Sequence, residues 1–239
     1  MDHVPVYEMD ENELMSRILF RDQLIIVLDK PVNIPVHAGP KGGPSLEDYF
    51  TQLHFGYKEM PRLAHRLDRD TSGCLVLGRH RKALAKLGRL FSSGGIDKTY
   101  WAVVAGGPTE EAGHIDRPLS KLNKKSGWKM VVDEAGQPSQ TDFRVLGRSE
   151  GICWLELKPL TGRTHQLRVH CAAMGWPILG DPVYGPVPGQ LGGDTGGVPL
   201  HLHARAVSVP LYPSRDAIAV TAEPPAHMLK ALQACGYSG

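Results

Sequence analysis

Short apolar runs separated by turn-forming residues dominate the hydrophobic pattern, and they predict more strands than helices. The run Leu24–Leu28 is apolar and β-branched and is followed by a proline, which is typical of a buried strand. The same reasoning predicts further strands at Cys74–Leu77, Lys98–Ala105, Cys153–Pro159 and, late in the chain, Leu200–Val209. Residues 31–44 and 185–198 are rich in proline and glycine and predict loops, and the polar, lysine-rich residues 118–130 predict an exposed hairpin or loop.

Two segments instead have the periodicity of amphipathic helices. Between Arg81 and Ser92, apolar residues share one face, and Lys82, Lys86 and Arg89 form a basic face. Because the predicted strands outnumber the helices and do not alternate regularly with them, the pattern favours an α+β fold.

The second helix follows a threonine. Thr164 is placed to cap a helix that runs from His165 to about Met174, where a glycine ends it. Its apolar positions Leu167, Cys171 and Met174 are predicted to face the protein interior.

The composition is that of a soluble globular protein. Of the 239 residues, 41% are hydrophobic and 22% are charged, and no apolar run approaches the length of a membrane span. The first 13 residues carry five acids and no Lys or Arg, which is the wrong charge for a targeting peptide, so we expect a cytoplasmic protein. The four cysteines are far apart without a C-x-x-C pair, which favours reduced, buried thiols.

The charge distribution is more informative than the net charge of +2. Residues 62–130 hold 14 of the 27 Lys and Arg but only 6 of the 25 acids, a local excess of +8. Such an excess is typical of a surface that binds RNA or DNA, although a solvated basic surface gives the same count.

One acid lies inside this basic region. Asp68 lies between Arg66 and Arg69 in a segment that ends in Thr-Ser-Gly. Taken alone, an aspartate before these residues is usually a turn or cap residue. Cations so close would also keep a carboxylate ionised and hold a polyanion nearby, which makes Asp68 a candidate reacting group.

Two further residues could complete a reactive site. Arg168 shares a helix face with His165, and its guanidinium could clamp a carboxylate through two parallel hydrogen bonds; a phosphate contact is the alternative. Tyr100 lies on one face of its strand, where its ring could stack on a base and its hydroxyl could form a hydrogen bond. A half-buried strand tyrosine is the plainer interpretation of Tyr100.

Three blocks of sequence resemble those of the RluA-type pseudouridine synthases. Residues 65–73 read HRLDRDTSG and match the family signature HRLDxxTSG. Residues 98–104 match its K-x-Y-x-A-x-V strand, and Gly162–His170 followed by Pro177–Gly185 matches its third block. The resemblance extends from about residue 21 to about residue 225.

This resemblance implies a pseudouridine synthase fold, in which a mixed, mainly antiparallel sheet is flanked by helices and loops. It places one catalytic domain at residues 21–225, between an N-terminal extension (1–20) and a C-terminal tail (226–239). The extension matches no S4 RNA-binding domain, so the chain is similar to the short form of the family. The implied partner is structured RNA, either 23S rRNA or tRNA or both; no DNA or membrane partner is expected, and we expect a monomer.

The resemblance also implies the chemistry. Family members break the C1′–N1 bond of a uridine, rotate the uracil and join C5 to C1′, so no redox cofactor, metal or nucleotide is expected. Asp68 would be the nucleophile, Arg168 its ion-pair partner, and Tyr100 the residue that packs on the uracil. Arg66 would fill the space left by the flipped nucleotide. The other residues expected to contact RNA or to support the loop are His65, Arg69, Arg163, His165 and Leu167.

Three other classes of protein remain to be weighed. A metal-dependent hydrolase could use His165, His170, His201 and His203, but the first two lie about 140° apart around a helix, a poor spacing for one metal. A glycosidase would need paired carboxylates, and Asp70, the only acid close to Asp68, lies among basic residues. A non-catalytic RNA-binding module predicts that Asp68 can be lost without consequence.

Overall fold

The computed structural model describes residues 9–39, 42–122, 129–185 and 198–239. The chain divides into two compact units, each with its own strands and core. The first comprises Met1–Asp97 and Ala204–Glu223, and the second comprises Lys98–His203 and Pro224–Gly239.

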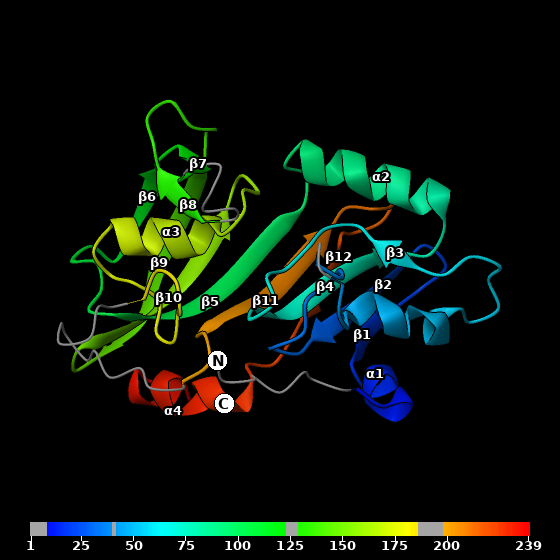
Figure 1. Ribbon diagram of the computed structural model, residues 1–239, viewed down its shortest axis with the longest axis horizontal. Coiled ribbons are helices and arrows are strands. Elements are labelled where there is room, and N and C mark those ends of the chain that lie inside the picture. The colour runs from blue at the N-terminus through cyan, green and yellow to red at the C-terminus, as the bar shows by residue number, and fades with distance from the viewer. Residues whose placement is uncertain (1–8, 40–41, 123–128, 186–197) are drawn as a thin grey trace. The chain divides into compact units, whose positions relative to one another are not determined.

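In the first unit, neighbouring strands of the sheet follow the order β1 (Ile18–Arg21), β2 (Ile25–Lys30), β4 (Ser72–Gly78) and β11 (Leu202–Val209). Two short strands extend it, because β3 (Arg62–Leu63) pairs with β4 and β12 (Ile218–Thr221) pairs with β11, both antiparallel. The helices of this unit are α1 (Glu11–Ser16), the 3-10 helix η1 (Leu46–Leu53) and α2 (Arg81–Ser92) (Figure 1).

Apolar side chains of β2, β4 and α2 form the core of the first unit. Val27, Val76 and Leu87 are fully buried in one cluster, and all seven residues of β4 are buried. The buried strands predicted at residues 24–28 and 74–77 and the helix predicted at residues 81–92 are confirmed, because their apolar positions are the ones that pack here.

In the second unit, the strands follow the order β5 (Asp97–Ala105), β10 (Ile152–Pro159), β9 (Gln140–Ser149) and β6 (Ala112–Asp116), and neighbours in this order are antiparallel. A separate hairpin consists of β7 (Leu119–Lys121) and β8 (Met130–Val132). The helices are α3 (Gln166–Ala173) and α4 (Ala226–Ala234).

Strand alternation sends the side chains of β5 and β10 into two different clusters. Leu155 of β10 packs with Leu167 of α3, whereas its neighbour Trp154 packs with Met228 of α4. Both faces of β5 and β10 therefore pack against buried side chains. The α+β class and the mainly antiparallel sheet are confirmed.

The domain limits expected from the sequence fall within packed elements. The limit at residue 20 lies inside β1, which pairs with β2, and residues 226–234 form α4, whose Met228 and Leu232 are fully buried. The first eight residues and most of the 185–198 loop lie outside the described residues.

The start of α3 differs from the prediction. The N-cap is His165 rather than Thr164. Its backbone is left-handed (φ 52°), and its side chain forms no capping hydrogen bond. The side chain of Gln166 instead accepts the Arg163 amide, and this bond holds the turn that precedes the helix. Met174 is 39% exposed rather than internal, because α3 ends at the preceding residue.

The lysine-rich segment at residues 118–130 is a hairpin whose two strands carry inward-facing residues. Leu119 and Met130 are buried against Val169 of α3, and residues 123–128 lie outside the described part. All four cysteines are free and buried, as predicted. Within the described residues, no helix is both long and apolar enough to cross a bilayer.

Candidate functional site

The segment that carries Asp68 runs between β3 and β4 and is fixed at both ends. On the β3 side, the Ala64 amide donates to the Val76 carbonyl (3.0 Å), and the Val76 amide donates to His65 Nε2 (2.9 Å). On the β4 side, the Thr71 amide donates to the Asp68 carbonyl (3.2 Å). Asp68 itself is half-buried at this turn. The local geometry presents a carboxylate on a backbone that has little freedom to move.

His65 supports this segment through its ring as well. The ring stacks on Phe91 of α2 with a centroid distance of 4.6 Å. Because Nε2 accepts the Val76 amide, a neutral His65 carries its proton on Nδ1. The first unit therefore uses His65 to tie the Asp68 segment to both β4 and α2.

Lys30 lies beneath the same segment and was not singled out from the sequence. Its side chain is fully buried, and its ammonium donates to the carbonyls of Arg69 (2.9 Å) and Pro31 (2.7 Å). Burial lowers the pKa of Lys30 to about 7, although the charges of Asp70 and Asp68 oppose that shift. The contact with Arg69 joins β2 to the backbone immediately after Asp68.

Gly73 allows β4 to start directly after the Asp68 turn. Its φ is +102°, and a Cβ placed there would lie 2.3 Å from the Ala204 carbonyl oxygen of β11. The two backbones approach too closely for any side chain at this position.

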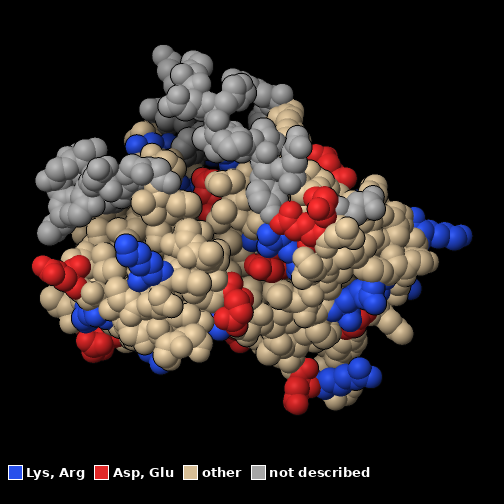
Figure 2. Space-filling view, turned by 90° about the horizontal axis from the view of Figure 1, so that it is seen from below, with Lys and Arg blue, Asp and Glu red and all other residues tan. Residues whose placement is uncertain are grey.

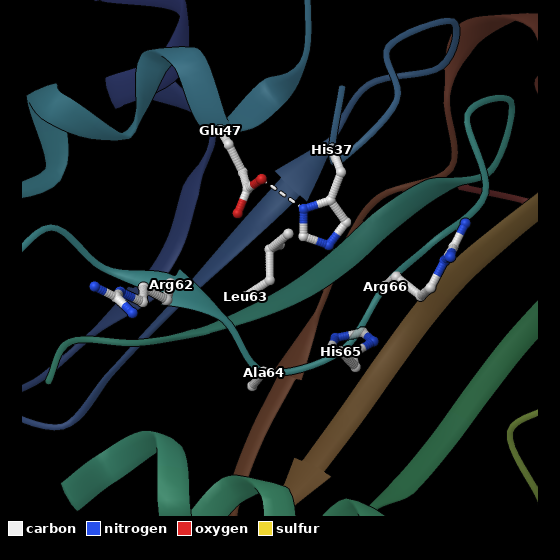
Figure 3. A pocket seen from close by; sticks show the side chains of 7 residues that line it. All are labelled: His37, Glu47, Arg62, Leu63, Ala64, His65 and Arg66. Atoms are coloured by element: carbon white, nitrogen blue, oxygen red, sulfur yellow. Dashed lines mark hydrogen bonds and ion pairs between the residues drawn. The ribbon is translucent and has the colours of Figure 1, made fainter. Parts of the chain in front are cut away.

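A pocket of about 400 Å³ adjoins the Asp68 segment on its N-terminal side, lined by His37, Glu47 and residues 62–66. Figure 3 shows His37 and Glu47 turned toward one another (Nδ1 to Oε2, 2.5 Å), with Arg62 and Arg66 at the two ends of the lining segment. Both arginines are exposed, as is Arg69, whose Nε lies 3.7 Å from Asp70. A carboxylate flanked by exposed guanidiniums can act on a substrate whose phosphates those guanidiniums hold.

Tyr100 belongs to the second unit, on β5. It is half-buried against the cluster that contains Leu157, its partner in the ladder between β5 and β10. Lys98 on the same strand face is half-buried, donates to the Thr161 carbonyl (3.4 Å) and has a pKa lowered by burial. The Tyr100 ring therefore packs against the core cluster. Tyr100 and Lys98 share one strand face, as the alternation of the sequence predicts.

Arg168 also belongs to the second unit and forms a buried ion pair with Asp181. Nε and Nη2 donate to the two carboxylate oxygens at 2.7 and 2.8 Å, and the side chains are 4% and 0% exposed. Burial alone would raise the pKa of the Asp181 carboxyl, but its hydrogen bonds and ion pair with Arg168 bring that pKa below its usual value. Arg168 therefore makes two parallel hydrogen bonds to a carboxylate, that of Asp181, which was not expected from the sequence.

The Asp181 carboxylate also organises the turn that follows it. Its Oδ1 accepts the amides of Val183 and Tyr184 at 2.9 and 3.0 Å. The Tyr184 hydroxyl lies 3.0 Å from His165 Nδ1 and accepts the Met130 amide at 2.9 Å. His165 is thus held at the start of α3 by the same turn that holds Arg168.

Gln166 is a second residue that sequence reasoning missed. Its amide group donates to the Gln140 carbonyl and its oxygen accepts the Thr161 hydroxyl, which joins α3 to β9 and to the end of β10. Leu167, expected to contact RNA, is 6% exposed and packs in the core beside Cys171. Arg163 is exposed, and its Nε donates to the Pro138 carbonyl.

The histidines considered as metal ligands have other partners. His170 Nδ1 and Nε2 contact the Thr141 hydroxyl and the Arg117 carbonyl, and His201 Nδ1 contacts the Pro199 carbonyl. Among the described residues, no three His, Cys, Asp or Glu side chains are grouped so that they could hold a metal ion.

Asp68 lies in the first unit, and Tyr100 and Arg168 lie in the second. The pairing of Asp68 with Arg168 that the sequence suggested therefore stays a prediction. Each unit nevertheless fixes its own candidate residues, through Lys30 and His65 in the first and through Asp181 and Gln166 in the second.

Comparison with known proteins defines the class. Residues 24–173 match the family model described as RNA pseudouridylate synthase. The chain therefore belongs to the RNA pseudouridylate synthase family and is an isomerase of that class.

Individual relatives agree with this assignment. An uncharacterized RNA pseudouridine synthase of Zymomonas mobilis is 46% identical over 174 residues, which cover 72% of this chain and 80% of the relative. Ribosomal large subunit pseudouridine synthase C of Buchnera aphidicola is 38% identical over 173 residues, 72% of this chain and 55% of the relative. The human structure named RNA Pseudouridylate Synthase Domain Containing 4 superposes with a TM-score of 0.78 at 27% identity, over 94% of this chain and 95% of that one.

Some relatives are much longer than the matched region. RNA pseudouridine synthase 3, mitochondrial, of Arabidopsis thaliana is 40% identical over 202 residues, which span only 42% of its length.

Proposed function

We propose that this protein converts specific uridines of structured RNA, in 23S rRNA or tRNA or both, into pseudouridine with Asp68 as the nucleophile. The observation that carries the proposal is the Asp68 segment, in which the HRLDRDTSG signature presents a half-buried carboxylate on a backbone fixed by Lys30 and His65. Membership of the pseudouridylate synthase family supports it.

The reaction is an isomerisation whose atoms balance within the substrate. The C1′–N1 glycosidic bond breaks, the uracil turns, C5 bonds to C1′, the C5 proton leaves and N1 gains a proton. Asp68 acts as a carboxylate that stabilises or attacks the electron-poor centre formed when the glycosidic bond breaks.

Tyr100 and Arg168 take supporting roles in the proposal. Tyr100 packs on the uracil, and its hydroxyl assists removal of the C5 proton. Arg168 orients the Asp68 carboxylate; the bonds to Asp181 use two of its five N–H donors. The exposed Arg66 fills the space left when the target nucleotide leaves its stack, an extrusion that costs a few kcal/mol.

The remaining assignments are supports and RNA contacts. Arg69 and Arg163 are exposed and are proposed to contact the RNA backbone. His65 and His165 are proposed to hold the Asp68 segment and the start of α3 in place.

Substitution of Asp68 tests the nucleophile directly. Asp68→Asn keeps the shape of the side chain and removes its charge, so we expect pseudouridine formation to stop while RNA affinity changes less than about twofold. Asp70→Asn, two residues further along, is the matched control and should retain activity. Normal pseudouridine formation by Asp68→Asn would exclude the proposed role of Asp68. RNA binding without any pseudouridine formation by the wild-type protein would favour a non-catalytic RNA-binding protein.

The substrate is found by mapping pseudouridine across rRNA and tRNA from cells with and without the gene. Sites that disappear in its absence and return with the wild-type protein, but not with Asp68→Asn, are its targets. We further propose a cytoplasmic monomer, which cell fractionation and sedimentation of the purified protein test, since some relatives carry mitochondrial names.

A further inference from the structure

Helix α2 carries four cations and no acid. Arg81, Lys82 and Arg89 are exposed, and Lys86 is half-buried beside them. The residues between them on the outer face are small, and a Cβ added at Gly88 would meet no atom within 4 Å. We call the four cations the α2 basic face.

The charge of this face is not neutralised by nearby carboxylates. No ion pair within the described part of the chain includes a side chain of α2, although other surface arginines pair readily, as Arg148 does with Glu111 and Arg144 with Glu156. On the surface shown in Figure 2, acidic and basic side chains lie interspersed. The α2 basic face is therefore a local concentration of unpaired positive charge.

The helix packs against the segment that leads to Asp68. Phe91 stacks on His65, and Ala64, Leu90 and Phe91 border one core cluster. In Figure 1, α2 lies alongside β3, which directly precedes that segment. A ligand on the α2 basic face would therefore be held by the element that supports the catalytic signature.

Tyr212 fixes the margin of this face. Its hydroxyl donates to Asp22 Oδ2 (2.7 Å), while Lys86 Nζ and Arg215 Cζ lie 6.0 and 5.2 Å from the centre of its ring. Lys86 of the helix and the exposed Arg215 therefore both lie close to this one ring. Because two cations already contact the ring, Tyr212 is not a free platform for stacking a base.

We infer that the α2 basic face binds the phosphate backbone of the RNA that flanks the modified uridine, an inference that rests on the proposed function. Four cations within about 12 Å of helix oppose a row of phosphates, and the small residues between them allow the backbone to approach. Because the outer face of the helix has no aromatic side chain, we expect it to contact the phosphates of the RNA rather than its bases.

Two other partners fit the helix less well. A membrane-bound helix inserts its apolar face into the lipid, but Ala83 and Leu87 of α2 are already buried in the protein. A protein partner usually needs aromatic or other large anchors at the centre of the contact, and the outer face of α2 offers none.

The experiment uses the full chain and a 20-base-pair RNA duplex as the probe. The double variant Lys82→Gln/Arg89→Gln should bind the duplex about tenfold more weakly at low salt. Its slope of log Kd against log salt concentration should fall by about 1 to 2, because two phosphate contacts are lost. Lys230→Gln, which removes an exposed cation from α4, is the matched control and should change neither quantity.

Charge reversal separates binding from folding. Lys82→Glu/Arg89→Glu should weaken binding more than the glutamine pair, while both variants should melt at the wild-type temperature because the side chains are exposed. With an RNA that contains a mapped target uridine, KM should rise and kcat at saturating RNA should stay unchanged.

Unchanged Kd and salt slope in both double variants would overturn the inference. Loss of binding to vesicles of phosphatidylglycerol with unchanged RNA binding would overturn it in favour of a membrane. If the wild-type protein formed no pseudouridine but its RNA affinity still depended on Lys82 and Arg89, the proposed function would fail and the RNA surface would stand.

Discussion

Asp181 illustrates how a residue without a chemical role of its own can decide whether Arg168 is usable. Both side chains are removed from water, so the ion pair between them offsets part of the cost of burying each charge. The amides of Val183 and Tyr184 supply further donors, which fix the carboxylate and therefore the plane of the guanidinium.

Replacement of Asp181 by asparagine should destabilise the protein and slow catalysis together. The variant removes the buried carboxylate charge that accepts two Arg168 hydrogen bonds, so we expect the free energy of unfolding to fall by about 3–5 kcal/mol at pH 7. The Asp181 pKa is depressed in the folded state, so the stabilisation is present above the unfolded pKa and is lost as the pH falls through the folded value. Urea titrations at pH 7 and pH 3 should show that the deficit shrinks in acid.

A surface carboxylate provides the control for Asp181. Asp142 pairs with His114 while both side chains are about half exposed, so Asp142→Asn should cost less than about 1 kcal/mol. Equal losses in the free energy of unfolding for the two variants would show that the buried Arg168–Asp181 pair stabilises the protein no more than a surface pair does.

Lys30 predicts a pH dependence of the same sign in a higher pH range. Its pKa falls from 10.5 to about 7 on folding, so between these values the unfolded chain binds more protons and stability rises with pH. The free energy of unfolding of Lys30→Met should therefore drop further below that of the wild type, by about 1.4 kcal/mol for each pH unit between about 7 and 9. Parallel denaturant titrations measure the difference, and the exposed Lys82→Met should show no such trend; a difference that is constant with pH would contradict the assignment.

At the scale of elements, the close contact between β4 and β11 is the most sensitive point. Gly73→Ala forces a positive φ on an L-residue and places Cβ against the Ala204 carbonyl, so we expect a loss of several kcal/mol or a protein that fails to fold. Gly88→Ala, in open space on α2, should instead stabilise the protein by about 0.5–1 kcal/mol. Thermal unfolding of both variants gives the comparison, and a tolerated Gly73→Ala would contradict it.

Elements whose stability depends on local periodicity were the ones that the sequence predicted. The apolar runs of β2 and β4 and the 3.6-residue repeat of α2 appear in the structure because those side chains form the core. The start of α3 was missed because the left-handed backbone of His165 is stabilised by Gln166 and Tyr184 rather than by a cap residue. Such a turn depends on partners that a local pattern does not show.

At the scale of the whole molecule, most supports of the candidate site join residues that are distant in sequence. Lys30 reaches the carbonyl of Arg69, 39 residues later, and Arg168 reaches Asp181 across 13 residues. The sequence signature identifies Asp68 as the candidate residue, but the contacts that hold its backbone are seen only in the fold. The family resemblance supplied the chemical roles, which physical pattern alone left open between a turn residue and a nucleophile.

The buried cysteines also allow local unfolding of the protein to be measured by chemical labelling. Burial raises the pKa of Cys74 to about 12 and of Cys153 to about 11, and it raises that of Cys171 further, so thiolate is scarce at pH 8. Maleimide should therefore modify these thiols only when the surrounding structure opens. Cys74 lies in the first unit and Cys171 in the second, so mass spectrometry of briefly labelled protein should time each unit separately. Equal labelling of native and urea-unfolded protein would contradict this prediction. If native labelling is slow, a cysteine that replaces Lys82 could be labelled with a dye while the four native cysteines are kept.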